Sequence, residues 1–184
     1  MNRITSNKIF IIAEAGVNSN GNINNAYSLI DVAIDAKVDA VKFQTSVPEA
    51  EASKNCGLAD YQKITASEYK DQLDLARKIH LPIDSFSILK EYTEKKGLIF
   101  LSSAFSLEGL KILNRLNLDY YKIPSGEITN YPYLCYVGKL NKKVIMSTGM
   151  STIKEIEDAV NILSKFGTKR TNITLLHCNT EYPT

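Results

Sequence analysis

The sequence predicts a parallel α/β protein, and three observations support this class. Short apolar runs alternate six times with segments whose apolar residues recur at helical spacing. The runs are apolar throughout, which is expected of strands that are covered on both faces. Polar residues gather directly after the runs. A doubly wound sheet and a (β/α) barrel both satisfy this pattern, and periodicity does not choose between them.

Each of the six expected strands is a short apolar run between polar or helical segments. They cover residues 9–13, 40–43, 98–101, 120–123, 144–146 and 173–176. The expected helices cover residues 26–34, 67–79, 83–96, 107–116 and 133–140, and a further helix follows Thr152. Thr152 and Glu155 have the spacing of a capping box, which predicts the start of that last helix. Residues 55–65 are expected to form a polar loop.

Composition places the chain among ordinary globular proteins and excludes several functions. The chain has 184 residues and no low-complexity tract or linker, so a single domain with a substantial core is expected. Lys plus Arg is 22 and Asp plus Glu is 20, a balance that argues against binding of nucleic acid or a membrane surface by bulk charge. We see no signal peptide and no apolar stretch long enough to span a bilayer.

Cysteine usage and nucleotide-binding motifs narrow the choice further. Cys56, Cys135 and Cys178 are widely spaced and form no C-x-x-C pair, which argues against a disulfide framework or a zinc knot and favours a cytoplasmic location. No G-x-G-x-x-G follows the first strand, which weakens a dinucleotide-binding interpretation. The absence of G-x-x-x-x-G-K-[ST] from the sequence removes the P-loop option.

Polar residues at the strand ends are the candidate functional groups. In a parallel barrel the carboxyl ends of all strands converge on the face where active sites are built. Two ammonium groups, several hydroxyls and glycine-flanked backbone N–H groups suit a phosphate ester, and two carboxylates could move protons or accept sugar hydroxyls. These groups belong to Glu14, Lys42, Gln44, Ser103, Lys122, Ser125, Glu127 and Ser147.

Each candidate also has a plain structural interpretation. One lysine at a strand end is usually a solvated charge, but Lys42 in V-K-F and Lys122 in Y-K-I are both flanked by apolar strand residues, which favours a role for the pair. The serines could be turn or cap residues. His177 fits a functional and a structural role equally well, and His80 is expected to be a surface residue of a helix.

Five motifs in this order resemble those of the N-acetylneuraminate (sialic acid) synthase family over nearly the whole chain. They are IIAEAGVN at 11–18, VKFQT at 41–45, YKIPSGE at 121–127, STGM at 147–150 and LHC at 176–178. The resemblance implies a TIM-type (β/α) barrel followed by a small antifreeze-like domain. About six βα units are present, so residues 1–184 are expected to be the N-terminal part of such a barrel, without the last strands and the antifreeze-like domain.

The resemblance also implies an activity. Enzymes of this family condense phosphoenolpyruvate with an N-acylated hexosamine, such as N-acetylmannosamine, and release a nonulosonic acid and phosphate. They use a divalent metal, Mn or Mg, that polarises the sugar aldehyde, and they work as homodimers. The family's metal-binding histidines lie beyond residue 184, so no metal ligand and no bound metal are expected within this chain.

Roles for individual residues follow from the matched motifs. Glu14 and Glu127 are expected to be catalytic, through proton transfer or stabilisation of positive charge. The groups expected to bind phosphoenolpyruvate or the sugar are Lys42, Gln44, Ser103, Lys122, Ser125, Ser147 and Tyr182. Ser19 stands where the family usually has histidine, and Ala104 stands where it usually has proline.

Two alternatives stay open at this point. Related barrels condense phosphoenolpyruvate with phosphorylated aldoses, and an unphosphorylated N-acyl sugar would be the discriminating substrate. The second alternative is a non-catalytic, phosphate-binding remnant or fragment. Residues 1–184 alone are expected to lack efficient turnover, because a (β/α) barrel needs eight strands and about 250 residues.

Overall fold

The computed structural model describes residues 9–53 and 55–180, which fall into two compact units. The first unit is Met1–Leu101 and the second is Ser102–Thr184. The boundary lies inside the third strand.

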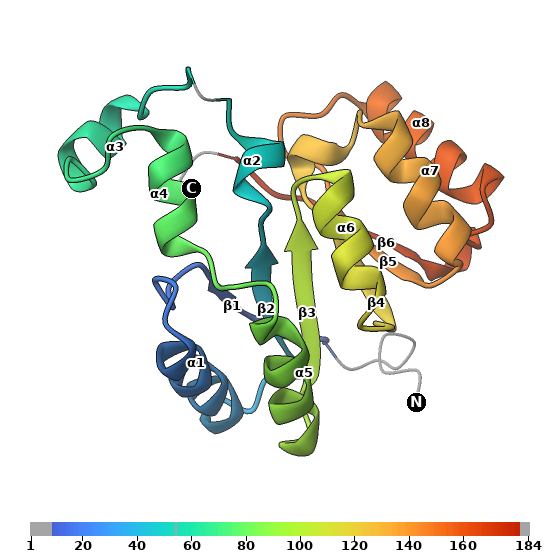
Figure 1. The fold of residues 1–184 in the computed structure, drawn as a ribbon. Coiled ribbons are helices and arrows are strands. Elements are labelled where there is room, and N and C mark those ends of the chain that lie inside the picture. The colour runs from blue at the N-terminus through green and yellow to red at the C-terminus, as the bar shows by residue number, and fades with distance from the viewer. Residues whose placement is uncertain (1–8, 54, 181–184) are drawn as a thin grey trace. The chain divides into compact units, whose positions relative to one another are not determined.

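The first unit combines parallel strands with five helices (Figure 1). Its elements are β1 (Ile12–Gly16), α1 (Ile23–Asp35), β2 (Ala40–Thr45), α2 (Pro48–Glu51), α3 (Asp60–Thr65), α4 (Gln72–Ile79), α5 (Ser85–Lys95) and the start of β3 (Ile99–Ala104), up to Leu101. The strands follow the order β1-β2-β3. β1 pairs with β2 in parallel, with Glu14 opposite Lys42.

The core of the first unit lies between the strands and helices α1 and α5. Ile30 on α1 is fully buried, and burial of such a side chain contributes about 1.5–3 kcal/mol. Tyr27 and Tyr92 join α1 to α5 through rings whose centroids are 4.7 Å apart. Phe43 and Phe100 stack at 5.8 Å between β2 and β3. The apolar strand residues thus pack as their uniform hydrophobicity predicts.

The second unit continues the alternation of strands and helices. Its elements are the end of β3, α6 (Leu107–Asn114), β4 (Tyr120–Ile123), the 3-10 turn η2 (Ser125–Glu127), α7 (Tyr131–Leu140), β5 (Lys143–Ser147), α8 (Ile153–Lys165), the turn η3 (Arg170–Asn172) and β6 (Ile173–Leu176). All strand pairs are parallel, and their order is β3-β4-β5-β6. Helices α7 and α8 lie side by side (Figure 1). Gly138 permits this approach, because a Cβ there would lie 2.7 Å from the Cβ of Phe166.

Strand order decides between the two architectures that the sequence left open. In both units each strand pairs with its neighbour in the chain. A doubly wound sheet instead reverses its strand order at a switch point. The expected TIM-type (β/α) barrel class is therefore confirmed, with six strands in the residues that the structure describes. Within those residues, none of the helices is long and apolar enough to cross a membrane.

Three local expectations need correction. β1 begins and ends three residues later than expected. β3 continues through Ala104, so Ser102 and Ser103 are buried residues inside a strand and do not follow it. The expected loop over 55–65 contains helix α3. Short-range contacts hold this helix: the Ala59 N–H donates to Gln62 Oε1 at 2.8 Å.

Candidate functional site

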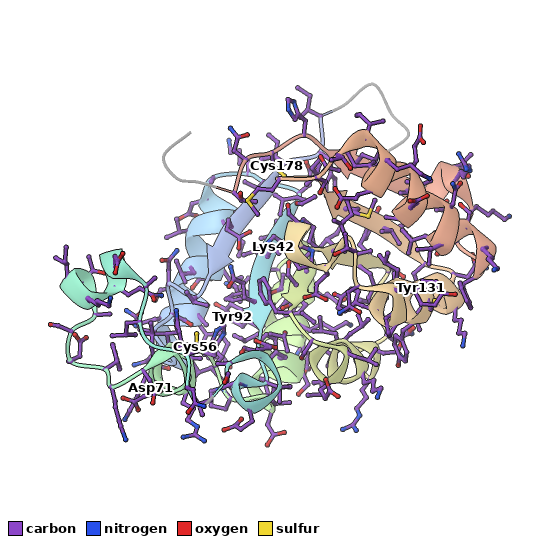
Figure 2. All side chains as sticks on the ribbon, turned by 90° about the horizontal axis from the view of Figure 1, so that it is seen from above. Lys42, Cys56, Asp71, Tyr92, Tyr131 and Cys178 are labelled. Carbon is purple, nitrogen blue, oxygen red and sulfur yellow. The ribbon has the colours of Figure 1, made fainter. Side chains whose placement is uncertain are left out.

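In the first unit, Glu14 in the middle of β1 and Lys42 within β2 form an ion pair. Their Cα atoms are partners in the parallel register, and an irregularity of the pairing follows between Glu14 and Gly16. Such bulges redirect side chains at strand ends. The Lys42 side chain, labelled in Figure 2, is 12% exposed and that of Glu14 is 49% exposed. The cation is thus mostly enclosed, while the carboxylate remains accessible to a ligand.

The Gln44 side chain lies near that of Glu14, next to Gly16. A Cβ at Gly16 would lie 3.3 Å from Glu14 Oε1 and 3.7 Å from Gln44 Nε2. Both side chains therefore approach the bare Cα of Gly16, whose φ of +55° also favours glycine. The first unit brings Glu14, Lys42 and Gln44 together on two adjacent parallel strands.

The loop after β1 packs against the end of α4. The Gly21 N–H donates to the Ile79 carbonyl oxygen at 2.9 Å. A Cβ at Gly21 would lie 2.5 Å from the Lys78 carbonyl oxygen, so only glycine fits without a shift. Ser19 in this loop is 1% exposed, and its hydroxyl has no hydrogen-bond partner among the described residues.

The expectation that His80 is a surface residue is wrong. His80 caps the C-terminus of α4 and is half-buried, with Nδ1 enclosed and without a partner in the described part of the chain. Burial lowers the pKa of its imidazole, although Glu51 and a hydrogen bond to the Gln44 backbone oppose this shift. A neutral His80 therefore stands next to the backbone of a candidate site residue. Sequence reasoning missed it because this proximity depends on how α4 packs.

In the second unit, a buried lysine contacts a serine on the next strand. Lys122 is 8% exposed, and its ammonium donates to Ser147 Oγ at 2.6 Å and to the Ile123 carbonyl oxygen at 3.0 Å. Ser103 is the Cα partner of Lys122 on β3, and Lys122 is the partner of Ile145 on β5. Because side chains alternate along a strand, Ser103, Lys122 and Ser147 share one face.

Ser125 belongs to the same unit and is held by the loop after β5. Its Oγ accepts a hydrogen bond from the Gly149 N–H at 2.9 Å and lies 3.8 Å from Cys178 Sγ. A Cβ at Gly149 would lie 2.6 Å from Thr180 Cγ2 and 3.0 Å from Ser125 Oγ. The backbone of Gly149 therefore reaches Ser125 only because position 149 has no side chain.

Cys178, labelled in Figure 2, follows β6 and is a free thiol. Burial raises the pKa of this thiol, but hydrogen bonds from Ser147, Thr148, Ser125 and Gly149 together outweigh burial and lower the pKa below its ordinary value. The sequence singled out Ser125 and Ser147, but no sequence signal linked them to Cys178. That link depends on the register of β5 with β6.

The remaining candidates lie as follows. Glu127 ends the turn η2, and its carboxylate accepts a hydrogen bond from Asn130 Nδ2 at 2.6 Å. His177 is exposed. Tyr182 lies outside the described residues. Within the described residues, no three His, Cys, Asp or Glu side chains converge in a way that could hold a metal ion. The expectation that the metal ligands lie beyond residue 184 stays a prediction.

Together these features define a class: a (β/α)-barrel protein whose strands carry largely enclosed lysines beside hydroxyl and carboxylate groups. The sequence model of the NeuB family matches residues 29–184, and the chain belongs to that family. The resemblance to sialic acid synthases is thereby confirmed.

Relatives with known names support the assignment. The chain is 49% identical over 176 residues to the N,N'-diacetyllegionaminic acid synthase of Campylobacter jejuni, covering 96% of this chain and 53% of the relative. It is 36% identical over 183 residues to the enzyme of that name from Legionella pneumophila, covering 98% of this chain and 51% of the relative. The crystal structure of the N-acetylneuraminic acid synthetase of Leptospira borgpetersenii, in complex with citrate, matches with a TM-score of 0.82 and 33% identity, over 97% of this chain and 56% of that one. The chain thus spans about half the length of these relatives.

Proposed function

We propose that the protein containing this chain condenses phosphoenolpyruvate with an N-acylated hexosamine, giving a nonulosonic acid and inorganic phosphate. The observation that carries this proposal is the buried Lys122 ammonium, hydrogen-bonded to Ser147 and located in the same unit as Ser125. A buried cation surrounded by hydroxyl groups suits a phosphate ester, because charge-assisted hydrogen bonds to phosphate oxygens are short and strong.

In this proposal the second unit binds the phosphate of phosphoenolpyruvate. Lys122, Ser125 and Ser147 donate to phosphate oxygens, and Ser103 stands next to Lys122 on the neighbouring strand. The contact between Lys122 and Ser147, at 2.6 Å, holds the ammonium and the hydroxyl together before the ligand arrives. Preorganised donors of this kind lose little freedom on binding, which favours affinity.

The first unit supplies a second lysine and the groups that are assigned to the sugar. On the strength of the matched motifs, Lys42 is assigned to phosphoenolpyruvate, and Glu14 and Gln44 are assigned to the hydroxyl groups of the sugar. The half-exposed Glu14 carboxylate supports this assignment, since it can accept hydrogen bonds from a ligand while it remains paired with Lys42. Tyr182 is assigned to the sugar on the strength of the family resemblance alone.

The proposed chemistry forms a carbon–carbon bond to the sugar and a carbon–oxygen bond to water, and it breaks the carbon–oxygen bond to phosphate. The methylene carbon of phosphoenolpyruvate attacks the aldehyde carbon of the open-chain sugar, and the aldehyde oxygen takes up a proton. Positive charge develops at the enol carbon, where a carboxylate such as Glu127 stabilises it. Water adds to that carbon and gives up a proton, for which Glu14 or Glu127 is the base. The carbon–oxygen bond to phosphate then breaks, and a keto group remains.

A divalent metal, Mn or Mg, belongs to the proposal as an activator of the aldehyde. The described residues contain no cluster that fits it, so no step is assigned to a metal-bound group. A homodimer and a cytoplasmic location are further parts of the proposal. The three free cysteines support the reducing location.

The names of the relatives favour one class of sugar. Two relatives are called N,N'-diacetyllegionaminic acid synthases. We therefore propose a hexosamine with two acetamido groups as the preferred acceptor, and N-acetylmannosamine as the second candidate because the matched crystal structure is of an N-acetylneuraminic acid synthetase.

The test uses the complete gene product with phosphoenolpyruvate, a divalent metal and one sugar at a time. Phosphate release and product mass are measured for a diacetamido hexose, N-acetylmannosamine and a phosphorylated aldose. Phosphate release with an N-acyl sugar, together with a product whose mass equals that of the sugar plus pyruvic acid, would support the proposal. Turnover only with the phosphorylated aldose would instead indicate the activity of the related barrels that condense phosphoenolpyruvate with phosphorylated aldoses. Phosphate binding without any turnover would support the alternative of a non-catalytic, phosphate-binding remnant.

Residues 1–184 produced alone give a separate comparison. We propose that they bind inorganic phosphate weakly but do not release phosphate from phosphoenolpyruvate. Metal-dependent condensation by these residues alone would overturn that part of the proposal.

A further inference from the structure

Two of the serines assigned to the phosphate share a single sulfur atom. Ser125 Oγ lies 3.8 Å from Cys178 Sγ, and the hydroxyl of Ser147 is hydrogen-bonded to the same sulfur. These residues come from three separate segments: the turn after β4, the end of β5 and the loop after β6. Cys178 is therefore the point where the candidate phosphate-binding hydroxyls meet within the second unit.

The direction of these hydrogen bonds follows from counting hydrogens. The thiol has one hydrogen, and it donates that hydrogen to the Leu176 carbonyl oxygen at 3.6 Å. Ser125 Oγ accepts from the Gly149 N–H, and Ser147 Oγ accepts from the Lys122 ammonium. With the thiol hydrogen directed to Leu176 and both serine oxygens already accepting, each serine hydroxyl has its own hydrogen available to donate to the sulfur.

The sulfur thus holds both serine hydrogens at one point, but it holds them weakly. A thiol sulfur is a poor acceptor compared with an oxygen atom. A phosphate oxygen is a strong, charged acceptor, so transfer of the two hydroxyl hydrogens from sulfur to phosphate is favourable. The Lys122 and Gly149 donors keep the two serine oxygens in place during that exchange.

We propose that Cys178 is a positioning residue, which orients the hydroxyl groups of Ser125 and Ser147 toward the place where a phosphate oxygen binds. This inference rests on the proposed function, because it assigns both serines to the phosphate of phosphoenolpyruvate. It predicts that Cys178 affects the handling of phosphoenolpyruvate and not that of the sugar. It also predicts that bound phosphate changes the surroundings of the thiol.

The first test compares Cys178→Ala and Cys178→Ser in the complete gene product. Without the sulfur, both hydroxyls lose their orientation, and the KM for phosphoenolpyruvate is expected to rise about five- to tenfold while the KM for the sugar stays unchanged. Serine keeps an acceptor at this position, so Cys178→Ser is expected to recover most of the loss. Cys56→Ala is the matched control, because Cys56 is an exposed thiol in the other unit.

The second test follows alkylation of the thiols by iodoacetamide, measured on peptides by mass spectrometry. Inorganic phosphate or phosphoenolpyruvate is expected to slow the alkylation of Cys178 at least threefold, on the order of the occupancy reached at a few times Kd, and to leave Cys56 unchanged. A Cys178→Ala enzyme with a normal KM for phosphoenolpyruvate would overturn the inference, as would the lack of protection.

The two tests separate the inference from the proposed function. If the unmodified protein shows no condensation, the proposed function fails, and protection of Cys178 by inorganic phosphate alone decides whether the thiol adjoins an anion site. If condensation is normal and Cys178→Ala raises both KM values equally, the thiol has a general structural role and the inference fails.

Discussion

Replacement of Lys122 by methionine tests the phosphate site most directly. Lys122→Met removes the ammonium but keeps an unbranched side chain of similar length inside the second unit. In the native protein the ammonium donates to Ser147 Oγ at 2.6 Å and to the Ile123 carbonyl oxygen at 3.0 Å. The variant should therefore lose a cation without leaving a large cavity.

The expected loss can be worked from these contacts. A hydrogen bond to a charged group contributes about 1.5–3 kcal/mol, and each 1.36 kcal/mol changes a rate constant tenfold. One lost contact to the phosphate should lower kcat/KM for phosphoenolpyruvate roughly 10- to 150-fold. Stability should change little, because the two orphaned acceptors cost about 1–3 kcal/mol each while the desolvation of a buried charge, several kcal/mol, is removed.

The assay is phosphate release by the complete gene product at varied phosphoenolpyruvate, with urea unfolding to confirm the fold. Lys111→Met is the control, because Lys111 is an exposed lysine on α6 in the same unit. A Lys122→Met enzyme that unfolds normally and keeps kcat/KM within about threefold of the control would refute a direct role for the ammonium, since that loss is below one charged contact.

Three further predictions concern stability. Gly21→Ala should destabilise more than Gly97→Ala in urea, because both positions have positive φ, 69° and 83°, but only at Gly21 does the added Cβ meet the Lys78 carbonyl oxygen at 2.5 Å; equal losses would contradict the contact. Thr152→Ala should cost about 1 kcal/mol, because its hydroxyl caps α8, and an unchanged urea midpoint would rule out this cap. Hydrogen bonds from the Thr152 backbone and hydroxyl lower the pKa of Glu155 from 4.5, so its contribution is present above that pH and is lost as the pH falls through the lowered pKa. Glu155→Gln should therefore flatten the acid side of the stability profile.

The sequence predicted the bounds of a strand correctly where the whole apolar run is paired with a neighbouring strand. β4 and β6 have the expected bounds, because each apolar run pairs along its length with β5. The run beginning at Ile9 is equally apolar, yet β1 begins at Ile12, opposite Ala40. A strand exists only where a neighbour supplies hydrogen bonds, and hydrophobicity alone does not reveal that limit.

Helix α3 was missed for the opposite reason. It is held by local polar contacts, such as the Lys63–Asp60 ion pair at 2.7 Å, and its Ile64 is 83% exposed. A helix without a buried apolar face gives no hydrophobic period to detect. Polar spacing alone resembles a loop, which is why residues 55–65 were expected to form one.

Candidate site residues could be selected from the sequence where a charged residue interrupts an apolar strand. Lys122 is such a residue, because a lysine is almost never buried without partners and therefore stands out within an apolar strand. The structure shows that Lys122 is buried and that Ser147 is one of its partners. The assigned roles of both residues stay predictions until the kinetic tests are made.

Nothing in the sequence marks Cys178 as unusual, since a part-buried cysteine is an ordinary finding. Its importance depends on the register of β5 and β6, which pairs Ser147 with Leu176 and so brings the thiol two residues further along to the serine hydroxyls. A shift of one residue would turn the side chains to the opposite face and separate these groups. Candidate residues can thus be selected from the sequence, but the hydrogen-bond network that orients them requires the strand register. If Cys178 orients the serines, a substitution that changes this register should raise the KM for phosphoenolpyruvate even where every candidate residue is retained.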